Sequence, residues 1–184
     1  MILVHGLIHS RLDCSNVFFL GLPQKWIKRL QITQNHAARL VTNCPRRNHI
    51  SPVLKNLHWL PIAKRVEFKA LCLVFRAYWQ LGPMYLSNMT QHYCPPRELR
   101  STDALLAIIQ SSRSASKGGR RLQTLGNSLW NQLPHQLRVS SSLMAFRKGL
   151  KTLHFFTSLQ IDTRPSKPLV GRCLNPRLRS MVRE

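Results

Sequence analysis

The carboxylate side chains of this chain are few and stand far apart. They are Asp13, Glu67, Glu98, Asp103, Asp162 and Glu184. Two-metal phosphoryl transfer needs several acids gathered around ions about 4 Å apart, and no two of these acids lie within three residues of each other. The sequence also has neither a phosphate-binding glycine loop nor a GxSxG nucleophile elbow. We therefore expect no enzymatic activity, no catalytic residue and no cofactor.

Cysteine and histidine, the usual zinc ligands, also occur without the spacing of a metal site. The pairs that lie close in sequence are His5 with His9, Cys44 with His49, and His92 with Cys94. Each pair supplies two ligands, whereas a structural zinc ion needs four at recognisable spacing. The cysteines number 5 and include no CxxC motif. We expect no bound metal and reduced thiols in an intracellular protein.

Positive charge dominates the chain, which has 28 Lys and Arg residues against 6 Asp and Glu and a formal charge of +22. Residues 14–66 and 104–161 contain no acid at all. Ordinary helix faces pair Glu with Lys at i,i+4, and here that partner is missing. Such an excess favours a polyanionic partner. We expect the chain to bind RNA or DNA with little sequence preference, in the nucleus rather than the cytoplasm.

The basic residues expected to contact phosphates lie on predicted helices and in the loops beside them. One group surrounds Trp26 and another follows Phe146, each opposite an apolar stripe, so both groups should face solvent. The full candidate set is Lys25, Lys28, Arg29, Arg39, Arg46, Arg47, Lys64, Arg65, Arg120, Arg121, Arg147, Lys148 and Lys151. Among the tryptophans, we expect Trp26 and Trp130 in the core. Trp59, beside a loop proline, stays open between core packing and base stacking.

Apolar residues recur at three- and four-residue steps, which predicts a mostly α-helical protein, an irregular bundle of about six helices. The expected helices are 2–16, 23–44, 51–57, 62–81, 121–133 and 142–156, with a short helical turn over 84–89. Ser51 and Ser142 are predicted helix caps, and Gly82-Pro83 is a predicted helix stop. Residues 97–120 form a predicted loop-rich connector, within which the apolar run 104–109 fits a strand or a helix equally well.

The composition divides the chain into two parts. We expect residues 1–156 to form one helical region with a weak break at 90–120. From residue 157 the apolar periodicity fades and prolines recur, which predicts a disordered basic tail over 157–184 that carries only +4 of the charge. No segment is long and apolar enough to span a bilayer, so no membrane partner is expected.

Several motifs occur in an order that resembles one protein family. They are Val4–Asp13 (VHGLIHSRLD), Gly21-Leu22-Pro23, Arg29-Leu30-Gln31, Gln34–Val41, His49–Ile62 (HISPVLKNLHWLPI), Arg65–Lys69, Gly119-Arg120, Leu129–Pro134 (LWNQLP) and Phe146–Lys151. Over residues 2–156 the chain is similar to the region downstream of the polymerase core in non-LTR (LINE-type) retrotransposon reverse transcriptases. The long HISPVLKNLHWLPI stretch makes the resemblance specific.

The resemblance implies a thumb-like helical region that supports handling of template and primer. The palm with its paired aspartates and the endonuclease would lie upstream, so the chain looks like the C-terminal piece of such an enzyme, started at an internal methionine. Polymerase activity does not carry over. Thr33 and His36 replace apolar residues of the family, and on a buried helix face each would cost about 1–3 kcal/mol if left unpaired. We therefore expect imperfect packing around the second helix.

Three functions remain open at this point. The first is a non-catalytic nucleic-acid-binding remnant that contacts the phosphate backbone of template–primer-like duplexes. The second is a translated retroelement relic without selected function. The third is a helical module that binds a protein partner through an exposed apolar face left uncovered by the missing palm.

Overall fold

The computed structural model describes residues 4–14, 16–88, 90–94, 105–110 and 122–160, and these are mostly α-helical, as predicted. The α-helices within these ranges are α2 (Ser10–Cys14), α3 (Gln24–Thr42), α4 (Ser51–Asn56), α5 (Ile62–Tyr78), α6 (Met84–Ser87), α7 (Asn127–Asn131), α8 (His135–Arg138) and α9 (Leu143–Gln160). π-helical turns span His5–His9 and Leu122–Gly126, and a 3-10 turn spans Asn16–Phe19. The described residues hold no strand and one isolated antiparallel bridge, between His92 and Ala107. The fold is an irregular helical bundle.

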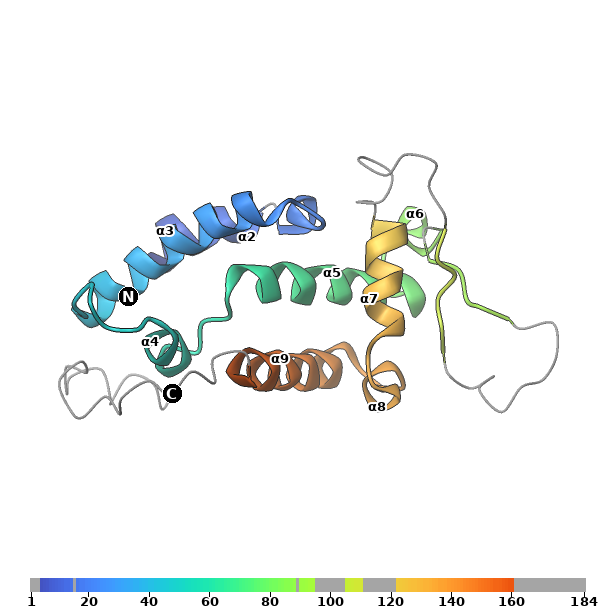
Figure 1. The fold of residues 1–184 in the computed structure, drawn as a ribbon. Helices are drawn as coiled ribbons and strands as arrows, with labels where there is room; N and C mark the ends of the chain where they lie inside the picture. The colour runs from blue at the N-terminus through green and yellow to red at the C-terminus, as the bar shows by residue number, and fades with distance from the viewer. Residues whose placement is uncertain (1–3, 15, 89, 95–104, 111–121, 161–184) are drawn as a thin grey trace.

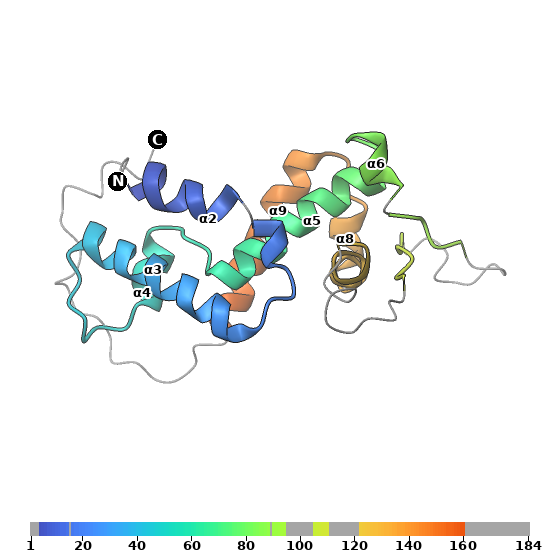
Figure 2. The same ribbon diagram turned by 90° about the horizontal axis from the view of Figure 1, so that it is seen from above.

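Helix α5 forms the centre of the bundle (Figure 1). Helices α2 and α3 lie along one side of it and α9 along the other, while α7 crosses near its C-terminal end. Figure 2 shows α9 alongside α5, with α3 and α4 gathered around the N-terminal end of α5. The central position explains why α5 is buried over most of its surface, and why its sequence has apolar residues beyond one stripe.

Within the described residues the core consists of three apolar clusters, two of which contain residues of α5. One lies around the C-terminal half of α5, where Phe75 stacks on Phe146 with ring centroids 4.5 Å apart and Trp130 is fully buried, as predicted. The second joins the N-terminal half of α5 to α2 and α3. The third packs α3 against α4 and includes Trp59, which is buried. Trp59 is therefore a core residue rather than a surface for base stacking.

The long central helix ends earlier than the sequence predicts. Gly82-Pro83 was the expected stop, but α5 ends at Tyr78 because Gln80 adopts a left-handed conformation with φ 53°. The Leu81 N–H then donates to the Arg76 carbonyl and the Gln80 N–H to the Ala77 carbonyl. This pair of bonds is the Schellman motif, which glycine usually forms at this position. A glutamine there gives no signal in the sequence.

The two predicted serine caps have different outcomes. Ser142 is confirmed as a cap, because its hydroxyl accepts a hydrogen bond from the Ala145 N–H at 3.2 Å. Ser51 is the first residue of α4, and Ile50 before it makes no side-chain cap bond. The prediction that Ser51 caps this helix was wrong.

Three expectations about α3 are also wrong. Its buried side is formed by Ile27, Gln34 and Ala38, and Trp26 points away from that side with 49% of its surface exposed. Trp26 is therefore not a core residue. Thr33 and His36 are exposed as well, so their polarity carries no burial penalty and the packing of α3 is not compromised by them.

The apolar run expected as a strand or a helix is neither. Residues 105–110 form no regular element beyond the Ala107–His92 bridge, Leu105 has a left-handed φ of 48°, and the segment is held mainly by side chains of α7. The Asn131 amide pairs with both the N–H and the carbonyl of Ala107, each at 2.9 Å, and the Trp130 indole N–H donates to the Leu105 carbonyl at 2.9 Å. The rest of the predicted connector, 97–104 and 111–120, lies outside the described residues.

The two ends of the expected helical region also differ in detail. The segment expected as one helix up to residue 16 is divided into a π-helical turn, α2 and a 3-10 turn. Helix α9 runs to Gln160, four residues into the predicted tail, so that part of the tail is helical. Residues 161–184 lie outside the described residues, and the division of the chain into a body and a tail stays a prediction.

Candidate nucleic-acid interface

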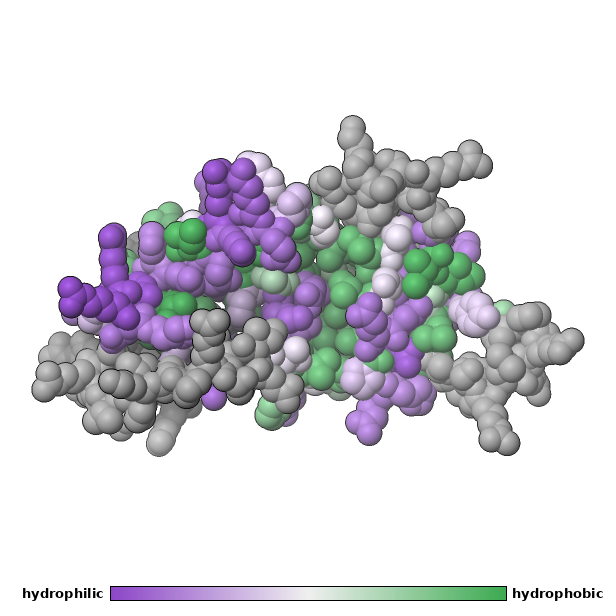
Figure 3. All heavy atoms as spheres, in the orientation of Figure 1, coloured by the Kyte–Doolittle hydropathy of each residue, from purple (hydrophilic) through white to green (hydrophobic). Residues whose placement is uncertain are grey.

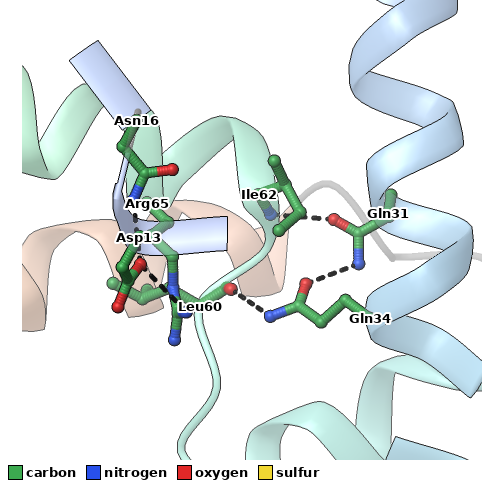
Figure 4. A network of polar contacts seen from close by, with 7 residues as sticks. All are labelled: Asp13, Asn16, Gln31, Gln34, Leu60, Ile62 and Arg65. Atoms are coloured by element: carbon green, nitrogen blue, oxygen red, sulfur yellow. Dashed lines mark hydrogen bonds and ion pairs between the residues drawn. The ribbon is translucent and has the colours of Figure 1, made fainter. Parts of the chain in front are cut away.

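Two glutamines of α3 hold the segment that leads into α5 (Figure 4). Gln34, fully buried, donates from its amide to the Leu60 carbonyl at 2.9 Å, and the Gln31 side-chain carbonyl accepts the Ile62 N–H at 2.8 Å. The two amides bond to each other at 2.9 Å. Because Pro61 offers no side-chain cap, Gln31 satisfies an N–H that the start of α5 would otherwise leave unpaired. This clamp fixes the loop that carries His58.

Both side-chain acids among the described residues, Asp13 and Glu67, are engaged by basic residues. The Arg65 guanidinium lies 3.2 Å from the Asp13 carboxylate, which also accepts a bond from the Asn16 amide (Figure 4). The Lys64 ammonium lies 2.8 Å from the Glu67 carboxylate. Two members of the candidate set, Lys64 and Arg65, are therefore neutralised locally.

A third candidate, Arg39, holds the loop between α3 and α4. Its guanidinium donates to the Asn48 carbonyl at 2.9 Å and also to the Pro45 carbonyl. Arg46 and Arg47 are exposed on that loop. Because the Arg39 guanidinium is engaged by these two carbonyls, Arg46 and Arg47 are better placed than Arg39 to contact phosphates at this end of α3.

The other end of α3 presents three exposed cations around an exposed aromatic ring. Lys25, Lys28 and Arg29 are all exposed, and the Arg29 guanidinium lies 5.0 Å from the centre of the Trp26 ring. That distance is within the range of a cation–π contact. Figure 3 shows hydrophilic residues along α3, and hydrophobic residues where α5 meets α7. The first turns of α3 are thus an exposed basic surface that also presents the half-exposed Trp26 ring.

A second basic surface, which we call the α5–α9 face, consists of Lys69 and Arg76 on α5 and Arg147 on α9. All three are exposed, and the charge of each lowers the pKa of the Cys72 thiol. Burial raises the pKa of the Cys72 thiol, while a hydrogen bond from Arg147 and the charges of the other two cations lower it. Lys69 and Arg76 were not among the residues predicted to contact phosphates. Their spacing of seven residues, with Cys72 between them, places them on one side of a helix and could have revealed them.

Lys148 and Lys151 extend this basic region around α9 to a hollow of about 320 Å³. The hollow is lined by His58, Lys148, Lys151, Thr152, Phe155 and Phe156. The Lys151 ammonium lies 5.9 Å from the centre of the Phe155 ring. Arg147, Lys148 and Lys151 are therefore exposed, as predicted, and they border an aromatic hollow that the residue pattern did not reveal.

Beneath this region, His154 of α9 is buried near α5. Its Nδ1 lies 3.9 Å from the Glu67 carboxylate, the same acid that pairs with Lys64. Burial lowers the pKa of His154, the Glu67 charge raises it and the Lys64 charge lowers it again. The net downward shift favours the neutral imidazole in the folded protein.

The structure does not gather the candidate residues into one patch. The start of α3 and the loop after it are separated by the length of that helix, 19 residues and therefore about 28 Å. Helices α3 and α9 lie on different sides of α5 (Figure 1). Arg120 and Arg121 lie outside the described residues. The exposed cations thus form separate surfaces at the start of α3, the α3–α4 loop and the α5–α9 face.

In the described part of the chain, no three side chains of His, Cys, Asp or Glu come together as a metal-binding group. No helix in the same ranges combines the length and apolar character needed to cross a bilayer. Among the described cysteines, none of which forms a disulfide, Cys14 and Cys94 are exposed and Cys44 and Cys72 are buried.

Comparison of the chain with protein-family models, with curated proteins and with solved structures finds no match.

Proposed function

We propose that the chain binds nucleic acid by contacts from its helical body to backbone phosphates, without catalysis of its own. The observation that supports this most is the imbalance of exposed charge. Asp13 and Glu67, the two acids in the described ranges, are occupied by Arg65 and Lys64, so the cations at the start of α3 and on the α5–α9 face have no carboxylate among the described residues to pair with. Phosphates supply the missing negative charge.

The kind of contact follows from the side chains. Arg and Lys at the ends of flexible stems bind phosphate oxygens without reading base edges, so the chain should bind many sequences alike. Trp26 adds an aromatic face beside Arg29 at one of these surfaces. The proposed ligand is a template–primer-like duplex, and the proposed origin is the thumb-side region of a non-LTR reverse transcriptase, as the sequence resemblance suggests.

A salt titration of binding tests the proposal. Fluorescence anisotropy would compare an RNA–DNA hybrid, a DNA duplex and single-stranded RNA, each in two unrelated sequences, over a range of salt concentrations. We expect log Kd to rise linearly with log salt on every ligand, with little difference between sequences. Affinity that is flat across salt, or that is confined to one sequence, would overturn the proposal.

A second candidate, protein binding, is favoured by one observation at the corner between α5 and α6. Leu81, Met84 and Tyr85 are large apolar residues close together in the chain, and all three are exposed. An exposed apolar group of this kind is typical of a protein-binding surface. Under this alternative, a Met84→Asp substitution would abolish capture of a partner while leaving binding of nucleic acid unchanged.

A further inference from the structure

The hollow on α9 combines positive charge with aromatic rings on the side of the helix that faces away from the core. Lys148, Lys151, Thr152, Phe155 and Phe156 recur at steps of three, one, three and one residues and so share one side of α9. The opposite side packs into the core. Phe156 keeps 66% of its surface exposed. The Phe156 ring therefore remains accessible rather than serving only the packing of the bundle, while Phe155 is half-buried.

The far wall of the hollow is His58, and its backbone is held in an unusual conformation. The His58 N–H donates to the Lys55 carbonyl at 3.0 Å and the Trp59 N–H to the Leu54 carbonyl at 2.9 Å, which forms a Schellman motif at the end of α4. His58 takes the left-handed position of this motif, with φ 54°. Glycine adopts that conformation without steric cost, and histidine is among the few other residues that enter it, so the motif fixes the direction in which the His58 side chain leaves the backbone.

The His58 side chain is directed at the aromatic wall across the hollow. Its ring centroid lies 6.2 Å from that of Phe155, with the planes 70° apart, an edge-to-face arrangement. The Gln31–Gln34 clamp fixes the loop at Leu60–Ile62, and the buried Trp59 anchors it next to His58. The hollow is thus bounded by a rigid loop on one side and a packed helix on the other.

We propose that this hollow binds one unpaired nucleotide of a single-stranded nucleic acid. The base would lie against Phe155 and Phe156, and Lys148 and Lys151 would hold the adjoining phosphates, with His58 at the edge of the base. Stacking on aromatic rings combined with cations along the backbone is the general mode of single-strand binding. A base within a duplex is stacked between its neighbours and cannot present its face to the hollow. This inference rests on the proposed function and adds a preference that phosphate contacts alone do not produce.

The size and charge of the hollow select this occupant. About 320 Å³ lies at the lower end of the range of small-ligand sites, which suits one nucleotide rather than several. The two lysines call for an anion, and no carboxylate lines the hollow among the described residues. The phenylalanine rings next to two lysines match a nucleotide, because its base is flat and aromatic and its phosphate is anionic.

The test separates stacking from phosphate binding. Anisotropy would be measured with a short single-stranded DNA, with the same strand carrying abasic sites at its centre, and with the duplex form. The abasic strand keeps every phosphate and loses only the bases. For the unaltered protein we expect the abasic strand to bind at least about fivefold more weakly than the intact strand, because a stacked base contributes that much or more.

Phe156→Leu is the decisive variant because it keeps an apolar side chain at an exposed position and removes the aromatic ring. We expect it to weaken binding of the intact strand by about fivefold or more and to leave the abasic strand and the duplex unchanged. Met144→Ala is the matched control, since Met144 is an exposed apolar residue of the same helix outside the hollow. Circular dichroism would verify that both variants keep their helix content.

Other outcomes overturn the inference in distinguishable ways. If intact and abasic strands bind alike, or if Phe156→Leu has no selective effect, phosphate binding stands and the nucleotide site does not. If Phe156→Leu instead abolishes binding to vesicles of anionic phospholipid and spares the oligonucleotides, the hollow receives an acyl chain. If the unaltered protein binds no nucleic acid at all, the proposed function fails together with the site.

Discussion

Replacing Lys25, Lys28 and Arg29 with alanine should make binding to nucleic acid less dependent on salt. The three side chains are exposed on the first turns of α3 and form no ion pair with the acids of the described residues. On B-DNA each lost phosphate contact lowers the log–log salt slope by about 0.9, so three lost contacts lower it by about 2.7. Over a fourfold rise in salt, the unaltered protein would then lose about 40 times more affinity than the variant.

The measurement is a salt titration of anisotropy on two unrelated DNA duplexes, and the slopes should fall equally on both. Circular dichroism should show unchanged helix content, since no side chain of the cluster contributes to the core. The control replaces Arg177, Arg179 and Arg183 of the predicted tail with alanine, which removes the same charge. A slope reduction as large in this control would mean that total charge matters and the surface of α3 does not. An unchanged slope in the α3 variant would refute the reasoning directly.

Three further predictions concern stability, each measured by urea denaturation. The Arg138 guanidinium is buried with Nε and one terminal nitrogen unbonded. Arg138→Met should therefore leave the free energy of unfolding unchanged or raise it by about 1–3 kcal/mol. A clear decrease in the free energy of unfolding would instead reveal an anionic partner of Arg138. Asn131→Leu removes both bonds to Ala107 and should cost about 1–3 kcal/mol, whereas the same change at the exposed Gln132 should cost little. Burial lowers the pKa of His154 below 6.5 in the folded protein, so the unfolded chain binds more protons at acidic pH. The free energy of unfolding should therefore decrease as pH falls from about 6.5. The same pH dependence in a His154→Leu variant would contradict this prediction.

The long helices could be predicted from the sequence because their signals are local. Helix α3 begins after Pro23, and α9 begins after a serine cap and carries an apolar stripe through Phe146 and Leu150. These features depend on neighbours within four residues, which the chain displays directly. The early end of α5 was missed because Gln80 in a left-handed conformation leaves no mark in the residue pattern.

The candidate site was harder to predict because it depends on which helix faces which. Trp26 has an apolar context in sequence, yet the side of α3 that meets α5 is the one with Ile27 and Gln34. The sequence shows Lys69 and Arg76 as ordinary surface cations, and they acquire a common surface with Arg147 only when α9 packs against α5. The clamp formed by two glutamines links residues about thirty positions apart, a distance over which periodicity carries no information.

The motifs on which the family resemblance rests are mostly structural in this fold. Trp59, Trp130 and Asn131 are core or bonding residues that hold segments together. Any chain that keeps the fold would keep them, whether or not it still binds anything, so these positions do not separate a binding protein from a relic. Exposed residues can separate a binding protein from a relic, because nothing in the packing requires a charge at Lys25 or a ring at Phe156. Affinity that depends on such exposed residues, with the fold intact, would be direct evidence that this surface binds nucleic acid.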